Sequence, residues 1–131
     1  MFIDFNKVLG VHEDALQLYG QRARALAANI VNSDTPNYLA RDIDFRDALA
    51  RQQRQHIERE QDDESEDARP ARLVAESELL YRQPLQPSLD GNTVEIHREI
   101  AAFSDNAIRF QATLQFISGR FKTLVDAFRG G

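Results

Sequence analysis

The residues that could carry chemistry in this chain are its histidines and acidic side chains, because it contains no cysteine. The three histidines stand far apart along the sequence: His12, His56 and His97. No HExxH pair, glycine-rich phosphate loop or nucleophile motif accompanies them. Asp42 and Asp44 alternate along a segment expected to be extended, so they should point to opposite faces and share no substrate. The Asp90–Asn92 tripeptide lacks the other ligands of a calcium loop and predicts a turn. We therefore expect no enzymatic activity and no metal or cofactor site.

Charge is distributed unevenly over the 131 residues. The formal net charge is −5, and seven of the 21 acidic residues lie between Glu58 and Asp67. The rest of the chain is close to neutral and offers no basic stripe for phosphates, which argues against a nucleic-acid partner. The start of the chain lacks the pattern of a cleaved signal, and no stretch approaches the roughly 18 apolar residues of a membrane span. We expect no membrane insertion, and either a cytosolic protein or one exported without a cleaved signal.

The positions of these polar groups depend on the helices that we expect at the two ends of the chain. Apolar residues in the first thirty positions recur at alternating spacings of three and four, the a/d pattern of a coiled coil. This pattern predicts a helix that is surest over residues 13–32. The seam includes four residues of that helix: Leu16, Tyr19, Leu26 and Ile30.

The C-terminal third repeats the pattern without a break and predicts a helix over residues 93–129, with Asn92 and Glu95 as a capping pair. Its seam residues are Ile100, Phe103, Phe110, Leu114, Ile117, Phe121, Leu124 and Phe128. An antiparallel partner would still leave the flanks of the phenylalanines partly exposed, which favours association with other chains. The alternative is a core formed inside the chain with the middle segment.

The middle of the chain is more polar. Residues 45–60 predict a short helix, and the acidic run at 61–71 predicts a solvated loop, with an acidic docking site as the alternative. Residues 72–80 fit either a short strand or a broken helix. Residues 81–92 predict an extended arm that ends in a turn, and this arm should lie against another segment. The residues that indicate it are Tyr81, Pro84, Pro87, Asp90, Gly91 and Asn92.

A sharp turn is expected where the first heptad arm ends. Pro36 excludes the helical conformation for Thr35, and the four residues from Thr35 to Tyr38 fit a type II β-turn. The third position of such a turn needs positive φ, which Asn37 can supply. Beyond the turn, Ile43 and Phe45 alternate with aspartates, as in an extended arm.

These elements predict a mainly α fold, in which long N- and C-terminal heptad helices form a coiled-coil hairpin with an extended or irregular middle segment. The expected coiled-coil core comprises residues 1–33 and 93–131. The turn and extended arm occupy residues 34–45. The variable middle segment covers residues 46–92 and contains the acidic loop at 61–71.

The stretch ANIVNSDTPNYLARDIDF, residues 28–45, resembles the signature ANxxNxxTPGYxxxxxxF of the axial proteins of the bacterial flagellar rod and hook. Residues 79–99, LLYRQPLQPSLDGNTVEIHRE, look like those of the proximal-rod proteins within that group. The resemblance covers about residues 1–50 and 79–131, and Asn37 departs from it where the family usually has glycine. It assigns the turn as an assembly element made of Asn29, Asn32, Thr35, Pro36, Asn37 and Tyr38.

The resemblance implies a structural subunit of the proximal rod in the basal body, within the cell envelope, that transmits torque and lines a tubular channel. The turn with its arm and the second extended arm would contact adjacent subunits. Implied partners are further copies, FliE, the rod protein FlgC and the flagellar type III export apparatus, through which the chain would pass unfolded. Phe45 and Leu49 resemble a short element that engages the export gate, with helix packing as the alternative. A cytosolic coiled-coil adaptor or chaperone is the alternative function.

Overall fold

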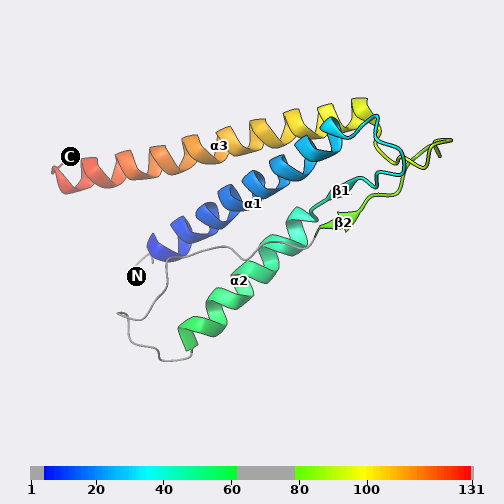
Figure 1. Cartoon of the computed structure of the whole chain (residues 1–131). Coiled ribbons are helices and arrows are strands. Elements are labelled where there is room, and N and C mark those ends of the chain that lie inside the picture. Colours follow the sequence, from blue (N-terminus) through cyan, green and yellow to red (C-terminus); the bar gives the residue numbers. More distant parts are fainter. Residues whose placement is uncertain (1–4, 62–78, 131) are drawn as a thin grey trace.

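The two segments with heptad patterns form the two longest helices of the computed structural model (Figure 1). The structure describes residues 5–61 and 79–130. Helix α1 runs from Phe5 to Val31 and helix α3 from Ile96 to Phe128. The two helices pack along each other in opposite directions. The mainly α-helical hairpin predicted from the sequence is therefore confirmed.

The shorter elements lie between these helices in the sequence. Helix α2 extends from Phe45 to Gln61, as the sequence predicted within one residue. Strand β1 (Arg41–Asp42) pairs antiparallel with strand β2 (Leu80–Tyr81), with Arg41 opposite Tyr81. The acidic loop expected at 61–71 and the undecided segment at 72–80 fall almost entirely outside the described residues.

Side-chain contacts fix the register between α1 and α3. Residue numbers rise along one helix as they fall along the other, which is the antiparallel arrangement. The C-terminal end of α3 extends beyond the start of α1 (Figure 1). The three register contacts are His12 with Phe116 at 4.5 Å between ring centroids, the Tyr19 carbonyl with Asn106 at 2.9 Å, and Asn29 with Glu99 at 3.0 Å.

The heptad seam of α3 divides into a half-buried and an exposed part. Glu99 and Asn106, both buried, lie on the face that meets α1, so the interface is turned relative to the apolar seam. Phe110, Ile117 and Leu124 are half-buried on that face. The exposed seam residues are Ile100, Phe103, Leu114, Phe121 and Phe128. On α1, Leu26 is fully buried, and the half-buried seam residues are Leu16, Tyr19 and Ile30.

Helix α2 is capped by Asp44 and packs against α1. The Asp44 carboxylate accepts a hydrogen bond from the Asp47 amide at 3.1 Å, the geometry of an N-cap side chain. The small buried core beneath α2 consists of Leu18, Ile43 and Ala48, with Phe45 and Leu49 packed against it. Because this apolar cluster is small, many apolar side chains of α3 lie outside it.

The capping pair expected at the start of α3 does not form. Glu95 occupies the N-cap position without a side-chain capping bond, and its carboxylate instead accepts hydrogen bonds from the Leu85 and Gln86 amides at 3.0 and 3.4 Å. Asn92 points to the end of α1. The prediction was wrong because both side chains have partners distant in sequence, which a local capping pattern cannot register.

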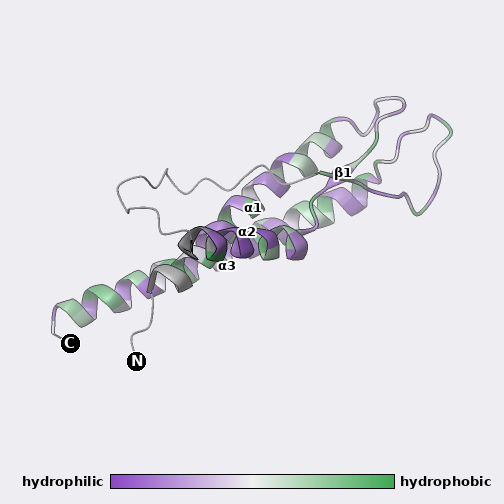
Figure 2. Ribbon diagram, turned by 90° about the horizontal axis from the view of Figure 1, so that it is seen from below, coloured by the Kyte–Doolittle hydropathy of each residue, from purple (hydrophilic) through white to green (hydrophobic). Residues whose placement is uncertain are grey.

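Apolar residues recur along α3 as far as its C-terminal end (Figure 2). They alternate with polar and charged residues, so the helix is amphipathic rather than continuously apolar. Within residues 5–61 and 79–130, no helix has the length and hydropathy needed to cross a membrane.

Candidate assembly interface

The chain reverses direction at a corner formed by residues 28–45, directly after α1. Thr35 and Tyr38 close the β-turn, with the Tyr38 amide donating to the Thr35 carbonyl at 3.3 Å. Asn37 has a φ of 61°, the positive value expected from the sequence. Asn32 supports the turn from the helix end, because its Oδ1 accepts the Thr35 hydroxyl hydrogen bond at 3.1 Å. Thr35, Pro36 and Asn37 remain exposed at the surface.

Asn29 ties the first arm to α1. Its side chain is fully buried and lies against the backbone of Arg41. The Asn29 Nδ2 donates to the Arg41 carbonyl at 2.7 Å, and the Arg41 amide donates to the Asn29 Oδ1 at 3.0 Å. The side chain therefore satisfies both polar groups of one arm residue, as a neighbouring strand would.

The second arm, residues 79–93, lies along the first arm of the same chain. The Asn37 amide donates to the Asp90 carbonyl at 2.9 Å, and the Thr93 amide donates to the Tyr38 carbonyl at 3.0 Å. The Arg82 amide continues the ladder to the Ala40 carbonyl at 2.8 Å. The facing backbone edges of the two arms are thus hydrogen-bonded to each other. The second arm therefore lies against another segment of the chain, as its sequence led us to expect.

Four charged side chains from four segments meet beneath the arms, and we call them the ionic cluster: Arg22, Asp42, Arg82 and Glu99. Arg22 donates from two nitrogens to the two carboxylate oxygens of Asp42, at 2.9 and 3.0 Å. Arg82 donates to Asp42 at 2.5 Å and also to Glu99, which is fully buried. The cluster joins α1, β1, the second arm and α3 through charge-assisted hydrogen bonds.

The cluster changes the titration of its members. Burial alone would raise the pKa of Asp42, but the hydrogen bond and charge of Arg22, the Ile43 amide and Arg82 outweigh it and hold the pKa below its usual value. The hydrogen bond to Asp42 raises the pKa of Arg22 in turn, against the opposing effect of burial. Both side chains therefore stay ionised, as a bidentate pair requires.

Sequence reasoning missed the ionic cluster. The only available signal was the alternation of Asp42 and Asp44, which placed them on opposite faces. The structure agrees with that separation, because Asp42 enters the cluster and Asp44 caps α2. Arg82 and Glu99 carried no local pattern, since they lie 17 residues apart.

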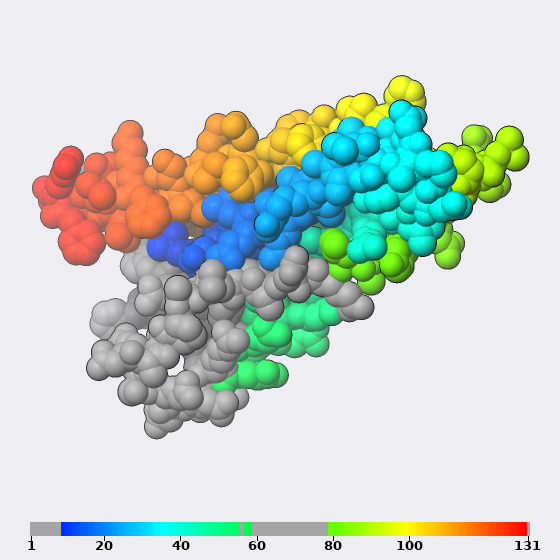
Figure 3. Space-filling view, viewed as in Figure 1, coloured from blue at the N-terminus to red at the C-terminus, as the bar shows by residue number. Residues whose placement is uncertain are grey.

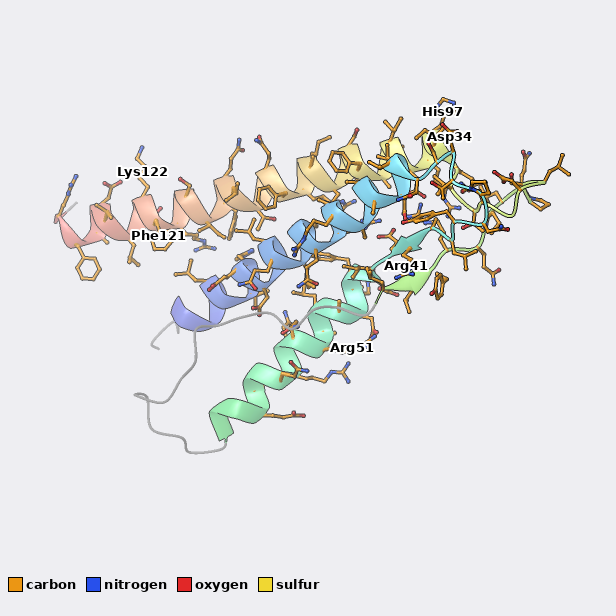
Figure 4. The ribbon with its side chains drawn as sticks, viewed as in Figure 1. Asp34, Arg41, Arg51, His97, Phe121 and Lys122 are labelled. Atoms are coloured by element: carbon orange, nitrogen blue, oxygen red, sulfur yellow. The ribbon has the colours of Figure 1, made fainter. Side chains whose placement is uncertain are left out.

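Many of the exposed apolar side chains lie along α3 and at the tip of the second arm. We call the exposed side of α3 the α3 flank: Ile100, Phe103, Leu114, Phe121, Val125 and Phe128. Phe121 and Lys122 project from opposite sides of α3 (Figure 4). The tip of the second arm is a second exposed site, with Leu85 at 79% and Leu89 fully exposed. The tip of the second arm lies at one end of the molecule, and the C-terminal part of α3 lies at the other (Figure 3).

The remaining residues singled out from the sequence have structural neighbours. Phe45 stacks on Tyr19 with ring centroids 4.3 Å apart, and Leu49 packs beside it. In the second arm, Pro84 is half-buried and Pro87 is exposed, both in irregular backbone. Among the residues that the structure describes, no group of three or more His, Cys, Asp or Glu side chains could hold a metal ion.

Comparison with known proteins gives a consistent result. No family model matches the chain. The chain is 39% identical to the flagellar basal body rod protein FlgB of Escherichia coli K12, over all of this chain and 99% of the relative. It is 41% identical to FlgB of Cereibacter sphaeroides, over 96% of this chain and 97% of the relative. It is 40% identical to FlgB of Salmonella typhimurium, over 94% of both chains.

Proposed function

Because this chain belongs to the family of the flagellar basal body rod protein FlgB, and is thus a structural subunit of the basal-body rod, we propose that it polymerises through its two terminal helices. In that assembly, α1 and α3 line the channel of a tubular rod and transmit torque along it. The observation that supports this proposal most is the exposed α3 flank. A contiguous apolar stripe of this kind is typical of an association surface.

The α3 flank is unlike the surface of a finished globular domain. Phe121 is 52% exposed and Phe128 is 85% exposed. Full burial of each such side chain is worth about 1.5–3 kcal/mol. Several of these side chains buried together against neighbouring copies would offset the entropy of assembly, which a single flanking residue would not.

The arms contribute the second contact. Their inner edges are paired within the chain, so only outward side chains remain for a neighbour. Leu39, Leu85 and Leu89 are the exposed apolar residues of the arms that suit this role. We place them against the adjacent subunit, together with the exposed turn residues Pro36 and Asn37.

The partners we propose are further copies of the chain, FliE, the rod protein FlgC and the flagellar type III export apparatus. Phe45 and Leu49 would engage the export gate before folding. In the folded chain both side chains pack against α1, so the gate would read them only in an unfolded chain. Folding would then hide the export element and leave the α3 flank for assembly.

The alternative of a cytosolic adaptor predicts a different behaviour in solution. An adaptor would form a stable, discrete dimer or trimer by itself. A rod subunit should instead remain a monomer whose helicity rises when FliE or FlgC is added, measured by circular dichroism and analytical ultracentrifugation. A small oligomer that melts cooperatively and ignores both rod proteins would contradict the proposed function.

A matched pair of substitutions on α3 tests the flank directly. Phe121→Ser removes an apolar side chain from the α3 flank, whereas Ile108→Ser removes one that is 69% exposed on a different face of the same helix. We expect Phe121→Ser to abolish swimming in soft agar and Ile108→Ser to retain it. Secretion of both variants into the periplasm is checked to separate assembly from export. Normal swimming with Phe121→Ser would overturn the assignment of the flank.

A further inference from the structure

The side-chain amide of Asn92 caps the C-terminal end of α1 from a position 60 residues beyond Asn32 in the sequence. Its Nδ2 lies 3.0 Å from the Asn32 carbonyl, 3.0 Å from the Ser33 carbonyl and 2.7 Å from the Thr35 carbonyl. These carbonyls belong to the helix end and the following turn, where backbone acceptors lack intrahelical donors. Asn92 is only 5% exposed. Its amide therefore supplies hydrogen bonds that water does not readily replace.

The orientation of this amide is fixed at both ends. The Asn92 Oδ1 accepts a hydrogen bond from the Val94 amide at 2.7 Å, while the Nδ2 faces the three carbonyls, and the backbone amide of Asn92 is held separately by the Asp90 carboxylate at 3.1 Å. Rotating the side chain by half a turn would place its oxygen against three carbonyl oxygens. One rotamer and one amide orientation are thus selected, as a positioning role requires.

The neighbours of Asn92 dock on the same turn. The Asp90 carbonyl accepts the Asn37 amide hydrogen bond at 2.9 Å. Gly91 has a φ of 73°, and a Cβ at this position would lie 2.6 Å from the Asn37 Oδ1. The positive φ therefore favours glycine at this position, where the second arm passes directly beside the Asn37 side chain. Three consecutive residues meet the corner, and each does so by a different interaction.

We propose that Asn92 is the positioning residue of the corner, and that it sets the direction in which the first arm leaves α1. Without its amide, the Thr35–Tyr38 backbone bond has to hold the turn without the shared donor that ties the carbonyls of residues 32, 33 and 35 together, and this bond should open more often. These carbonyls precede Asn92 by 57 to 60 residues. The corner is consequently completed only when the C-terminal third of the chain has arrived. The inference goes beyond the proposed function and rests on it only for the consequence in assembly.

The test replaces the donor while keeping the shape. Asn92→Asp retains the acceptor for the Val94 amide but places a carboxylate oxygen against three carbonyls, and Asn92→Ala removes both groups. Gln83→Glu, an added carboxylate on an exposed residue of the same arm, is the control. Amide hydrogen exchange is measured residue by residue by NMR on the full-length protein. The readout is the Tyr38 amide, with the Leu26 amide in α1 as the internal reference.

We expect Tyr38 exchange to accelerate by at least about tenfold in both Asn92 variants, as the loss of one buried hydrogen bond implies. Leu26 and the control should change less than twofold. Acidification from about pH 8 to about pH 5 should restore protection in Asn92→Asp, after correction for intrinsic rates. The reason is that burial against three carbonyl oxygens should raise the pKa of the introduced carboxyl above its ordinary value, and the protonated form can again donate to a carbonyl. Asn92→Ala has no such group and should not recover.

Two results would overturn the inference. Unchanged Tyr38 exchange in Asn92→Asp would show that the turn holds itself, and an equal acceleration of Leu26 would show a general loss of stability instead of positioning. Swimming is scored separately. A loosened corner in a strain that swims normally would leave the positioning role intact and contradict the assembly role proposed for the corner.

Discussion

The corner and the α3 flank differ in where their side chains find partners. In the corner, Asn29, Asn92 and the ionic cluster pair nearly every buried polar group within one copy. Along the α3 flank, large apolar side chains such as Phe128 have no cover within residues 5–61 and 79–130. The difference teaches that buried polar contacts fix the shape of the corner, whereas the apolar side chains of the α3 flank stay open for the neighbouring copies that we propose.

This division has a physical reason. Buried hydrogen bonds are directional and fix one geometry, so they suit a corner that must be built before assembly. Apolar burial is non-directional and scales with area, so it suits a surface that several copies share. Substitutions in the two regions should consequently have different signatures, in monomer stability for the corner and in assembly for the flank.

The largest effect on the monomer is expected from Arg82→Met, which leaves the fully buried Glu99 without its cationic partner. Loss of one member of a buried pair costs about 3–5 kcal/mol. We expect a fall of this order in the free energy of unfolding, measured by urea denaturation. Phe128→Ser on the α3 flank is the control and should change that energy by less than about 0.5 kcal/mol. Equal effects of the two substitutions would erase the distinction between the regions.

A smaller effect is expected from Asn37→Val at the turn. A β-branched residue with a φ near 61° costs about 1–3 kcal/mol. Helicity by circular dichroism should remain nearly unchanged, because α1 ends before the turn, whereas assembly should be impaired. Asn37→Gly, which tolerates positive φ, serves as the matched control and should assemble. Normal motility with Asn37→Val would contradict the role of the turn.

The smallest expected effect is the dependence of stability on acid. The pKa of Asp42 is lowered in the folded chain, so its contribution is complete above the unfolded value of 3.8 and is lost as pH falls through the folded value. The free energy of unfolding should therefore decline below about pH 4. Asp42→Asn should lower stability at neutral pH and flatten this decline. An unchanged slope in Asp42→Asn would assign the acid sensitivity to other carboxylates.

The sequence predicted those parts of the fold that depend on neighbours in the chain. Periodicity located α1, α2 and α3, and the Pro36-Asn37 pair predicted the positive φ. Local rules failed at Asn92 and Glu95, which looked like a capping pair but bind partners elsewhere. A capping pattern describes the hydrogen bonds that a side chain can form with residues nearby in the sequence. It contains no information about partners that are distant in the sequence.

The assembly surfaces show the same limit. The sequence anticipated exposed phenylalanines on α3, because a two-helix hairpin cannot cover every side of a seam. It did not anticipate the ionic cluster or the pairing of the two arms with each other. Those features depend on which residues of separate segments meet, as Arg22, Asp42 and Arg82 do, and no spacing rule encodes that choice.

The bond from Asn106 to the Tyr19 carbonyl has a mechanical meaning for a shaft that turns. Asn106 is 2% exposed and, with Glu99, is one of the two buried polar residues of α3 on the face that meets α1. Sliding of the helices that parts this amide from its acceptor would leave a buried polar group unpaired, at a cost of about 1–3 kcal/mol. In the rod assembly that we propose, this bond would resist sliding of α1 along α3, so that a twisting load would pass through the subunit without shear between its two helices.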